Sequence, residues 1–89
     1  MRITRDYALD LIQKFGQEVA KNAEVLATQK VVGTRSSQKS LSEELWRLQK
    51  ALAYKDITPK DAVSQLHQMA ESAYHLVNDG WRDLLRSMA

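Results

Sequence analysis

The chain has 89 residues, no cysteine and a net charge of +2 from 13 Lys or Arg and 11 Asp or Glu residues. A chain of this length holds one hydrophobic core, so we expect a single helical domain over residues 1–89. The lack of cysteine excludes a disulfide scaffold, a thiolate zinc site and a cysteine nucleophile. The first ten residues hold no apolar segment of signal-peptide length, and the longest apolar run is residues 51–54. We expect a cytoplasmic protein that does not enter a membrane.

The first predicted element is one long amphipathic helix over about residues 4–32. Its apolar stripe, at spacings of mostly three and four, consists of Ala8, Leu11, Ile12, Phe15, Val19, Ala23 and Leu26. Thr4 is placed to cap this helix, and Asp6 lies in the first turn, where the helix dipole favours an acid. Gly16 inside the helix costs about 1 kcal/mol relative to alanine. Close approach of a neighbouring helix is the simpler explanation for this glycine, and a functional kink is the alternative.

The next segment, residues 33–40, reads GTRSSQKS and contains no apolar residue. This composition of turn-forming and small polar residues predicts a loop. Ser40 and Glu43 then fit a capping box at the start of a helix. We expect that second helix to be short and to end at about Lys55, with a one-sided stripe of leucines at positions 41, 45, 48 and 52.

A third helix is predicted to begin at Pro59, because proline is favoured at the first helical position and Thr58 can cap the helix start. Its apolar stripe is Ala62, Val63, Leu66, Met69, Ala70, Ala73, Leu76 and Val77. Two alternatives arise near Gly80: a helix end followed by a short fourth helix, or one continuous helix to about Met88. The apolar residues after Gly80 keep the phase of the preceding stripe, which favours continuity.

These elements predict an all-α fold, a small helical bundle of a long, a short and a long helix, with the last helix split near Gly80 as the alternative. At 1.5 Å per residue a long helix spans about 42 Å and the short one about 22 Å. The short helix therefore cannot cover the two long apolar stripes. From this mismatch we predict a homo-oligomer, in the first place a homodimer.

Four polar residues recur every four positions on the third predicted helix: His67, Glu71, His75 and Asp79. Imidazole and carboxylate groups are metal ligands, and two histidines spaced i, i+4 can bind zinc. Here the histidines are eight positions apart, about 12 Å along the axis, so they cannot share one ion. We interpret this stripe as a solvated helix face and expect neither a metal nor a cofactor.

Three groups of residues suggest contact with a partner. Lys30, Arg35 and Lys39 carry the charge of an acid-free stretch from residue 25 to residue 42, although a solubilising loop is the simpler interpretation. Two tryptophans each lie beside cations, a composition common at interface hot spots, although a partly buried core edge also explains each tryptophan. Candidate partner-binding residues are Lys30, Arg35, Lys39, Trp46, Arg47, Lys50, Trp81 and Arg82.

No nucleophile with a base, no paired catalytic carboxylates and no glycine-rich phosphate loop is recognisable, so we do not expect an enzyme. The sequence instead predicts a non-enzymatic protein-interaction module, a small regulator or inhibitor that binds another protein. The alternative is a nucleic-acid-binding regulator that uses the basic loop at residues 30–39. The mixture of charges along most of the chain does not favour this alternative, because nucleic-acid binders concentrate Lys and Arg on one surface.

Overall fold

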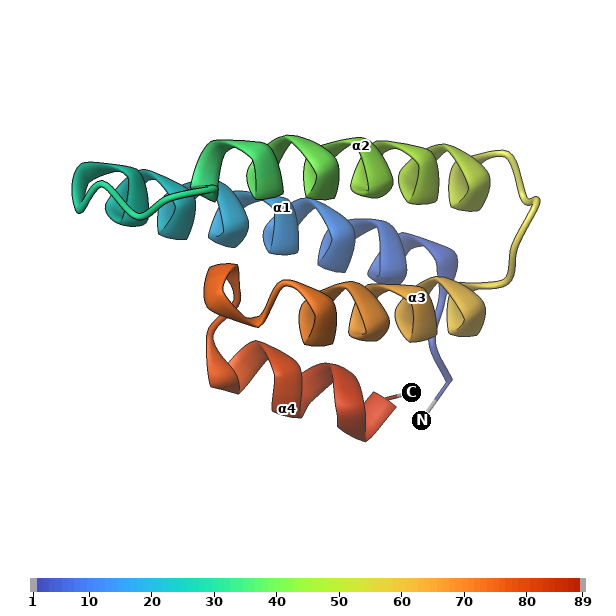
Figure 1. Ribbon diagram of the computed structural model, residues 1–89. Coiled ribbons are helices and arrows are strands. Elements are labelled where there is room, and N and C mark those ends of the chain that lie inside the picture. The colour runs from blue at the N-terminus through green and yellow to red at the C-terminus, as the bar shows by residue number, and fades with distance from the viewer. Residues whose placement is uncertain (1, 89) are drawn as a thin grey trace.

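The computed structural model describes residues 2–88, and within them the fold is all-α, as the sequence predicts. The elements are α1 (Arg5–Thr28), α2 (Thr34–Ala53), α3 (Pro59–Ser72), a short 3₁₀ helix η1 (Tyr74–Leu76) and α4 (Asp79–Met88). Consecutive helices run in opposite directions. Helices α1, α2 and α3 pack against one another, and α4 packs below α3 (Figure 1). None of the helices in the described part of the chain is long and apolar enough to cross a membrane.

The core is built around the stripe of α1. Phe15 and Ala23 are fully buried at the centre of this stripe, and every stripe residue from position 8 to position 23 is buried. The stripes of α2 and α3 pack against it, as do Leu76 and Leu85 from the last third of the chain. Thr4 caps α1 by accepting a hydrogen bond from the backbone amide of Tyr7, and Thr58 caps α3 in the same way. The predicted starts of the first and third helices are therefore confirmed.

The loop predicted at residues 33–40 is wrong, because α2 already begins at Thr34. Its buried stripe continues backwards from Leu41 to Thr34, which is only 2% exposed although its side chain is polar. The Thr34 hydroxyl donates a hydrogen bond to the Val31 carbonyl at 3.0 Å and is satisfied there. Because polar residues occupy these stripe positions, a search for apolar spacing missed this part of the helix. Ser40 is consequently an interior helix residue and not a cap.

Helices α1 and α2 end in the same way. In each, the residue after the C-cap adopts a left-handed backbone: Lys30 with φ of 59° and Lys55 with φ of 63°. Their amides and those of the following residues bond back to the last carbonyls of the helix, in the pattern of a Schellman motif. Glycine is the usual residue at this position, because a Cβ atom makes the left-handed conformation unfavourable.

The third helix is not continuous through Gly80, so the continuity that the apolar phase favoured is wrong. The helix ends at Ser72, the chain turns through η1, and α4 begins at Asp79. The side-chain amide of Asn22 on α1 donates a hydrogen bond to the Leu76 carbonyl at 3.0 Å and so holds this turn against the core. Gly80 lies in the first turn of α4 rather than at a helix end.

The length mismatch that predicted a homodimer is absent, because α2 has 20 residues against 24 in α1. Helix α2 accompanies α1 over most of its length (Figure 1), and the apolar stripe of α1 is covered within one chain. The order of long, short and long helices is thereby corrected to two long helices followed by two shorter ones. The homodimer itself stays a prediction that now needs a different reason.

Candidate protein-interaction surface

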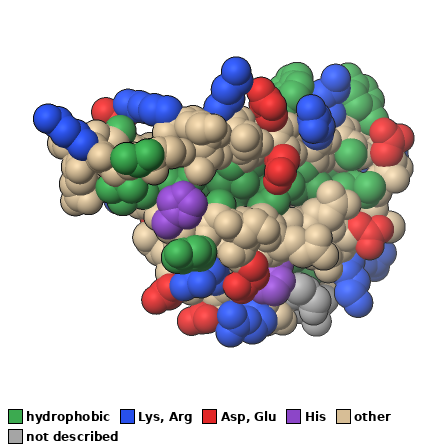
Figure 2. Space-filling model, viewed as in Figure 1, with side chains coloured by type: hydrophobic (Ala, Val, Ile, Leu, Met, Phe, Trp, Pro, Cys, Tyr) green, Lys and Arg blue, Asp and Glu red, His purple; other side chains and the backbone are tan. Residues whose placement is uncertain are grey.

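The side of α2 that faces away from the core is the most distinctive exposed surface. We call it the α2 ridge, and it consists of Arg35, Lys39, Trp46, Arg47, Lys50 and Tyr54, all of them exposed. Lys and Arg side chains follow the upper edge of the molecule over α2 in Figure 2. Because a 20-residue helix rises about 30 Å, these side chains form an elongated surface on a rigid element.

Aromatic residues occupy the C-terminal half of the α2 ridge. Trp46 is 60% exposed and Tyr54 is 72% exposed, although tryptophan is normally a well-buried residue. The Lys50 ammonium lies 5.6 Å from the centre of the Trp46 ring, in position for a cation–π contact of about 0.5–1 kcal/mol at such an exposed site. Two exposed aromatic rings next to cations give this half of the ridge both apolar area and positive charge.

The ridge also concentrates the positive charge of the protein. Residues 30–55 contain six Lys or Arg against two Glu, whereas the rest of the chain contains seven cations against nine acids. The charges look mixed along the sequence but are unevenly distributed: residues 30–55 carry a net positive charge, and the rest of the chain carries a net negative charge. Such a surface attracts an acidic partner and repels a basic one.

A groove lies on each side of α2. The groove toward α3 encloses about 460 Å³ beside Leu48, Met69 and Arg47, and its apolar floor is visible between the two helices in Figure 2. The groove toward α1 encloses about 410 Å³ and is bordered by Trp46. The ridge therefore stands above its surroundings, and Trp46 forms the edge between its outer face and the α1 groove.

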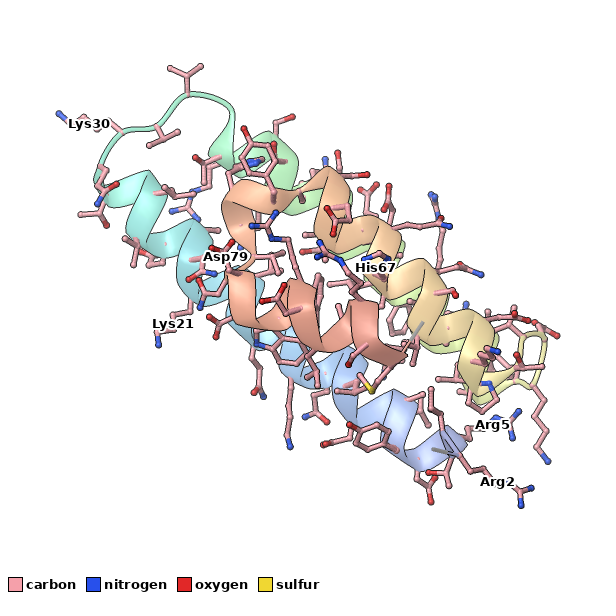
Figure 3. The ribbon with its side chains drawn as sticks, turned by 90° about the horizontal axis from the view of Figure 1, so that it is seen from below. Arg2, Arg5, Lys21, Lys30, His67 and Asp79 are labelled. Atoms are coloured by element: carbon pink, nitrogen blue, oxygen red, sulfur yellow. The ribbon has the colours of Figure 1, made fainter. Side chains whose placement is uncertain are left out.

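The three cations predicted around the loop lie at the N-terminal end of α2. Arg35 is 3.7 Å from a Glu24 carboxylate oxygen of α1 and also donates to Gln38, so its charge is partly balanced. Lys30 points away from the tip of the α1–α2 connection, as its label shows in Figure 3. Next to it Val32 is 98% exposed. The structure therefore brings Arg35 and Lys39 onto the ridge and leaves Lys30 at its end.

Trp81 and Arg82 do not belong to this surface. The Trp81 ring packs edge-on against Phe15, with 5.8 Å between ring centres and 82° between ring planes, at the margin of the core. Arg82 pairs with Asp79 one turn earlier, and this hydrogen bond raises the pKa of Arg82. For these two residues the structure supports the core-edge alternative, so the prediction that they form an exposed contact is not supported by their positions.

Tyr54 is a member of the α2 ridge that the sequence prediction missed. It follows Trp46 by eight residues and Lys50 by four, which places the three side chains on one side of a helix. This spacing was available in the sequence, since the second helix was predicted to reach about Lys55, and α2 does continue to Ala53 with Tyr54 as its C-cap.

The four residues of the predicted polar stripe lie on three elements: His67 and Glu71 on α3, His75 on η1 and Asp79 at the start of α4. His67 Nε2 lies 3.3 Å from a Glu71 carboxylate oxygen, which in turn contacts Arg86 of α4 at 3.3 Å, and His67 lies near α4 in Figure 3. His75 belongs to η1 and its ring contacts Tyr74. Among residues 2–88 no three His, Asp or Glu side chains converge in a way that would hold a metal ion.

Comparison with known proteins assigns no family: no protein-family model, no curated protein and no solved structure matches the chain. The functional argument therefore rests on the chemistry of the described surface. That chemistry consists of exposed cations and aromatic rings on a rigid helix, which suits binding to another macromolecule.

Proposed function

We propose that this protein is a non-enzymatic interaction module, a small regulator or inhibitor, whose α2 ridge binds an acidic surface of another protein. The observation that carries the proposal is the exposed Trp46 beside Lys50, with Arg47 and Tyr54 adjacent. Tryptophan, tyrosine and arginine are the residues most enriched at the energetic centres of protein interfaces. Because they stand on one helix, little conformational entropy is lost when a partner binds.

The helix ends give independent support. Lys30 after the end of α1 and Lys55 after the end of α2 occupy left-handed positions, where glycine would be more stable by about 1 kcal/mol. Backbone strain of this kind concentrates at functional positions. Both lysines are exposed, and both extend the positive surface of the ridge.

A charge-reversal experiment tests the proposal. The ridge variant carries Lys39→Glu, Arg47→Glu and Lys50→Glu, and the matched control carries Arg2→Glu, Lys21→Glu and Lys60→Glu at exposed positions outside the ridge. Each protein is immobilised and exposed to an extract of cells that naturally produce it, and the bound proteins are quantified by mass spectrometry. We expect at least one acidic protein to be retained by the wild type and the control but lost from the ridge variant.

The candidate partner must then bind the purified wild-type protein directly, with an affinity that falls at least about tenfold in the ridge variant, since like charges across an interface cost several kcal/mol. Equal binding by the ridge variant and the control would contradict the proposal. Circular dichroism of both variants establishes that the substitutions leave the helices intact.

Nucleic acid is the second candidate partner, favoured by the six cations of residues 30–55 and by the aromatic rings among them. The contact surface is then the α2 ridge and not a flexible loop, because residues 34–40 are helical. Anisotropy of a labelled duplex and of a labelled single strand, titrated at low and at physiological salt, tests this candidate. If nucleic acid is the partner, the logarithm of the binding constant falls with the logarithm of the salt concentration. In the ridge variant the slope of this line becomes shallower by about one unit for each phosphate contact removed. Absence of binding at low salt would exclude it.

Two further predictions accompany the proposal. The protein is expected not to be an enzyme, for which the lack of any recognisable catalytic constellation in the sequence is the support. Its cytoplasmic location stays a prediction, supported by the cysteine-free sequence.

A further inference from the structure

The groove between α1 and α2 has a different character from the ridge beside it. It is lined by Ile12, Gln13, Gly16, Gln17, Ala20, Ser42, Leu45, Trp46 and Gln49. Its surface is mainly apolar, because Ile12 and Leu45 form the floor and the indole of Trp46 forms one wall. Trp46 is exposed to solvent over more than half of its area.

None of the nine lining residues carries a charge. The other hollows described on this surface each include charged side chains, such as Glu44 and Arg47 toward α3 or Lys50 and Asp56 at the end of α2. In a protein with a charged residue at 27% of its positions, an uncharged groove is the surface that tolerates close approach of another molecule without leaving a buried, unpaired ion.

The polar rim of this groove suits a copy of itself. Gln13, Gln17 and Gln49 each carry a carboxamide, which both donates and accepts hydrogen bonds and can therefore pair with an identical group. Lysine or glutamate side chains facing their own copies would repel. A surface that is apolar at its centre and self-complementary at its rim meets the requirement of a two-fold symmetric interface, in which the same patch is used on both subunits.

We infer that the α1–α2 groove binds a second copy of this chain, with Trp46 of each copy packed against the groove of the other. Burial of a large aromatic side chain that is 60% exposed in the single chain provides the main gain. Arg47 and Tyr54 do not line this groove, so a dimer leaves them free for the partner of the α2 ridge, whereas Lys50 lies over the Trp46 ring at the edge of the dimer contact. Trp46 lies at the edge of both surfaces, so in the dimer the partner of the α2 ridge contacts the remaining ridge residues; the inference does not depend on the proposed function.

The test compares two isosteric substitutions of exposed glutamines. Gln17→Glu places like charges in the uncharged groove, and Gln68→Glu makes the same change on α3 outside it. Light scattering over a concentration series should give a wild-type mass of twice the 10.2 kDa chain. We expect Gln17→Glu to raise the dimer dissociation constant about tenfold or more and Gln68→Glu to leave it unchanged.

A second measurement follows the groove itself. In a Trp81→Phe background Trp46 is the only tryptophan, so its emission should shift to the blue as rising concentration drives dimerisation, and Gln17→Glu should abolish that shift. A monomeric wild-type mass at millimolar concentration would overturn the inference and leave the groove to a different molecule. A dimer that responds equally to both glutamine substitutions would also overturn it. A variant that carries only Lys39→Glu and Arg47→Glu, neither of which lines the groove, should keep its dimeric mass, which separates this result from failure of the proposed function.

Discussion

The two tryptophans have similar neighbours in the sequence but opposite positions in the structure. Trp46 precedes Arg47 and lies 60% exposed on α2, with the Lys50 ammonium over its ring. Trp81 precedes Arg82 and packs edge-on against Phe15 at the margin of the core. A tryptophan next to a cation therefore does not identify an interface. Its phase relative to the buried residues of its own helix separates the two cases: Trp81 lies four residues from Leu85, which is buried on α4, whereas Trp46 is displaced from the leucine stripe of α2.

The largest expected effect comes from removing each indole in turn. Trp81→Ala should lower the free energy of unfolding by about 2–3 kcal/mol, because it opens a cavity beside Phe15 at a partly buried site. Trp46→Ala should change it by less than about 0.5 kcal/mol, because the lost side chain is mostly in water. Urea denaturation at a concentration that keeps both variants monomeric measures the two values. Similar losses for the two substitutions would contradict the assignment of different roles.

The next effect concerns the turn that positions Trp81. Asn22→Ala removes the hydrogen bond to the Leu76 carbonyl and should cost about 1–2 kcal/mol, since that part-buried acceptor loses its partner. In a Trp46→Phe background the Trp81 emission should move to the red as its packing loosens. The same substitution in a Trp81→Phe background should leave the Trp46 emission in place, because Asn22 contacts the η1 turn and not α2. A shift of both tryptophans would indicate a general loss of structure instead.

A smaller effect, of opposite sign, is expected at the end of α2. Lys55→Gly should raise the free energy of unfolding by about 1 kcal/mol, because glycine adopts the left-handed conformation with φ of 63° without a steric penalty. The same substitution removes one charge beside the ridge and should weaken partner binding. Lys55→Asn also tolerates this backbone conformation and serves as a second test of the stability gain. A loss of stability in both variants would mean that the lysine side chain itself stabilises the fold.

The smallest effect is expected from the cation over Trp46. Lys50→Met keeps the aliphatic stem and removes the charge, so it should lower the free energy of unfolding by no more than about 0.5–1 kcal/mol. Thermal unfolding at low and at high salt distinguishes this contact from general charge effects, because one close contact is screened less than the field of distant charges. If Lys50→Met instead raises the free energy of unfolding, repulsion among the cations of the ridge is larger than the attraction between Lys50 and the Trp46 ring.

The sequence predicted the parts of the fold in which apolar residues mark the buried face. The stripe of α1, the leucines of α2 and the start of α3 at Pro59 follow directly from spacing and capping. The first two turns of α2 were missed because Thr34 occupies a buried position with a polar side chain, satisfied by the Val31 carbonyl. The break before α4 was missed because an amphipathic helix on each side of a turn can keep the same phase by coincidence. The turn at this break is held in place by the hydrogen bond from Asn22 to the Leu76 carbonyl, and these two residues are 54 positions apart in the sequence.

The candidate surface was predicted in part. Trp46, Arg47 and Lys50 lie together and exposed, as the spacing along a helix indicates. Tyr54 was missed although the predicted second helix already included it, and Arg82 was included although Asp79, three residues earlier, is its partner. The uncharged α1–α2 groove has no signature in the sequence, since its residues come from two helices whose relative rotation is set by tertiary packing.

The most direct test of the central claim, that the α2 ridge is the surface that binds a partner, uses two exposed tyrosines. A photo-crosslinking phenylalanine analogue replaces either Tyr54 on the ridge or Tyr74 on η1, which are 72% and 64% exposed. After irradiation of cells that naturally produce the protein, the account predicts a crosslinked product with another protein from position 54 and none from position 74. Crosslinking from position 74 alone, or equal products from both positions, would contradict it.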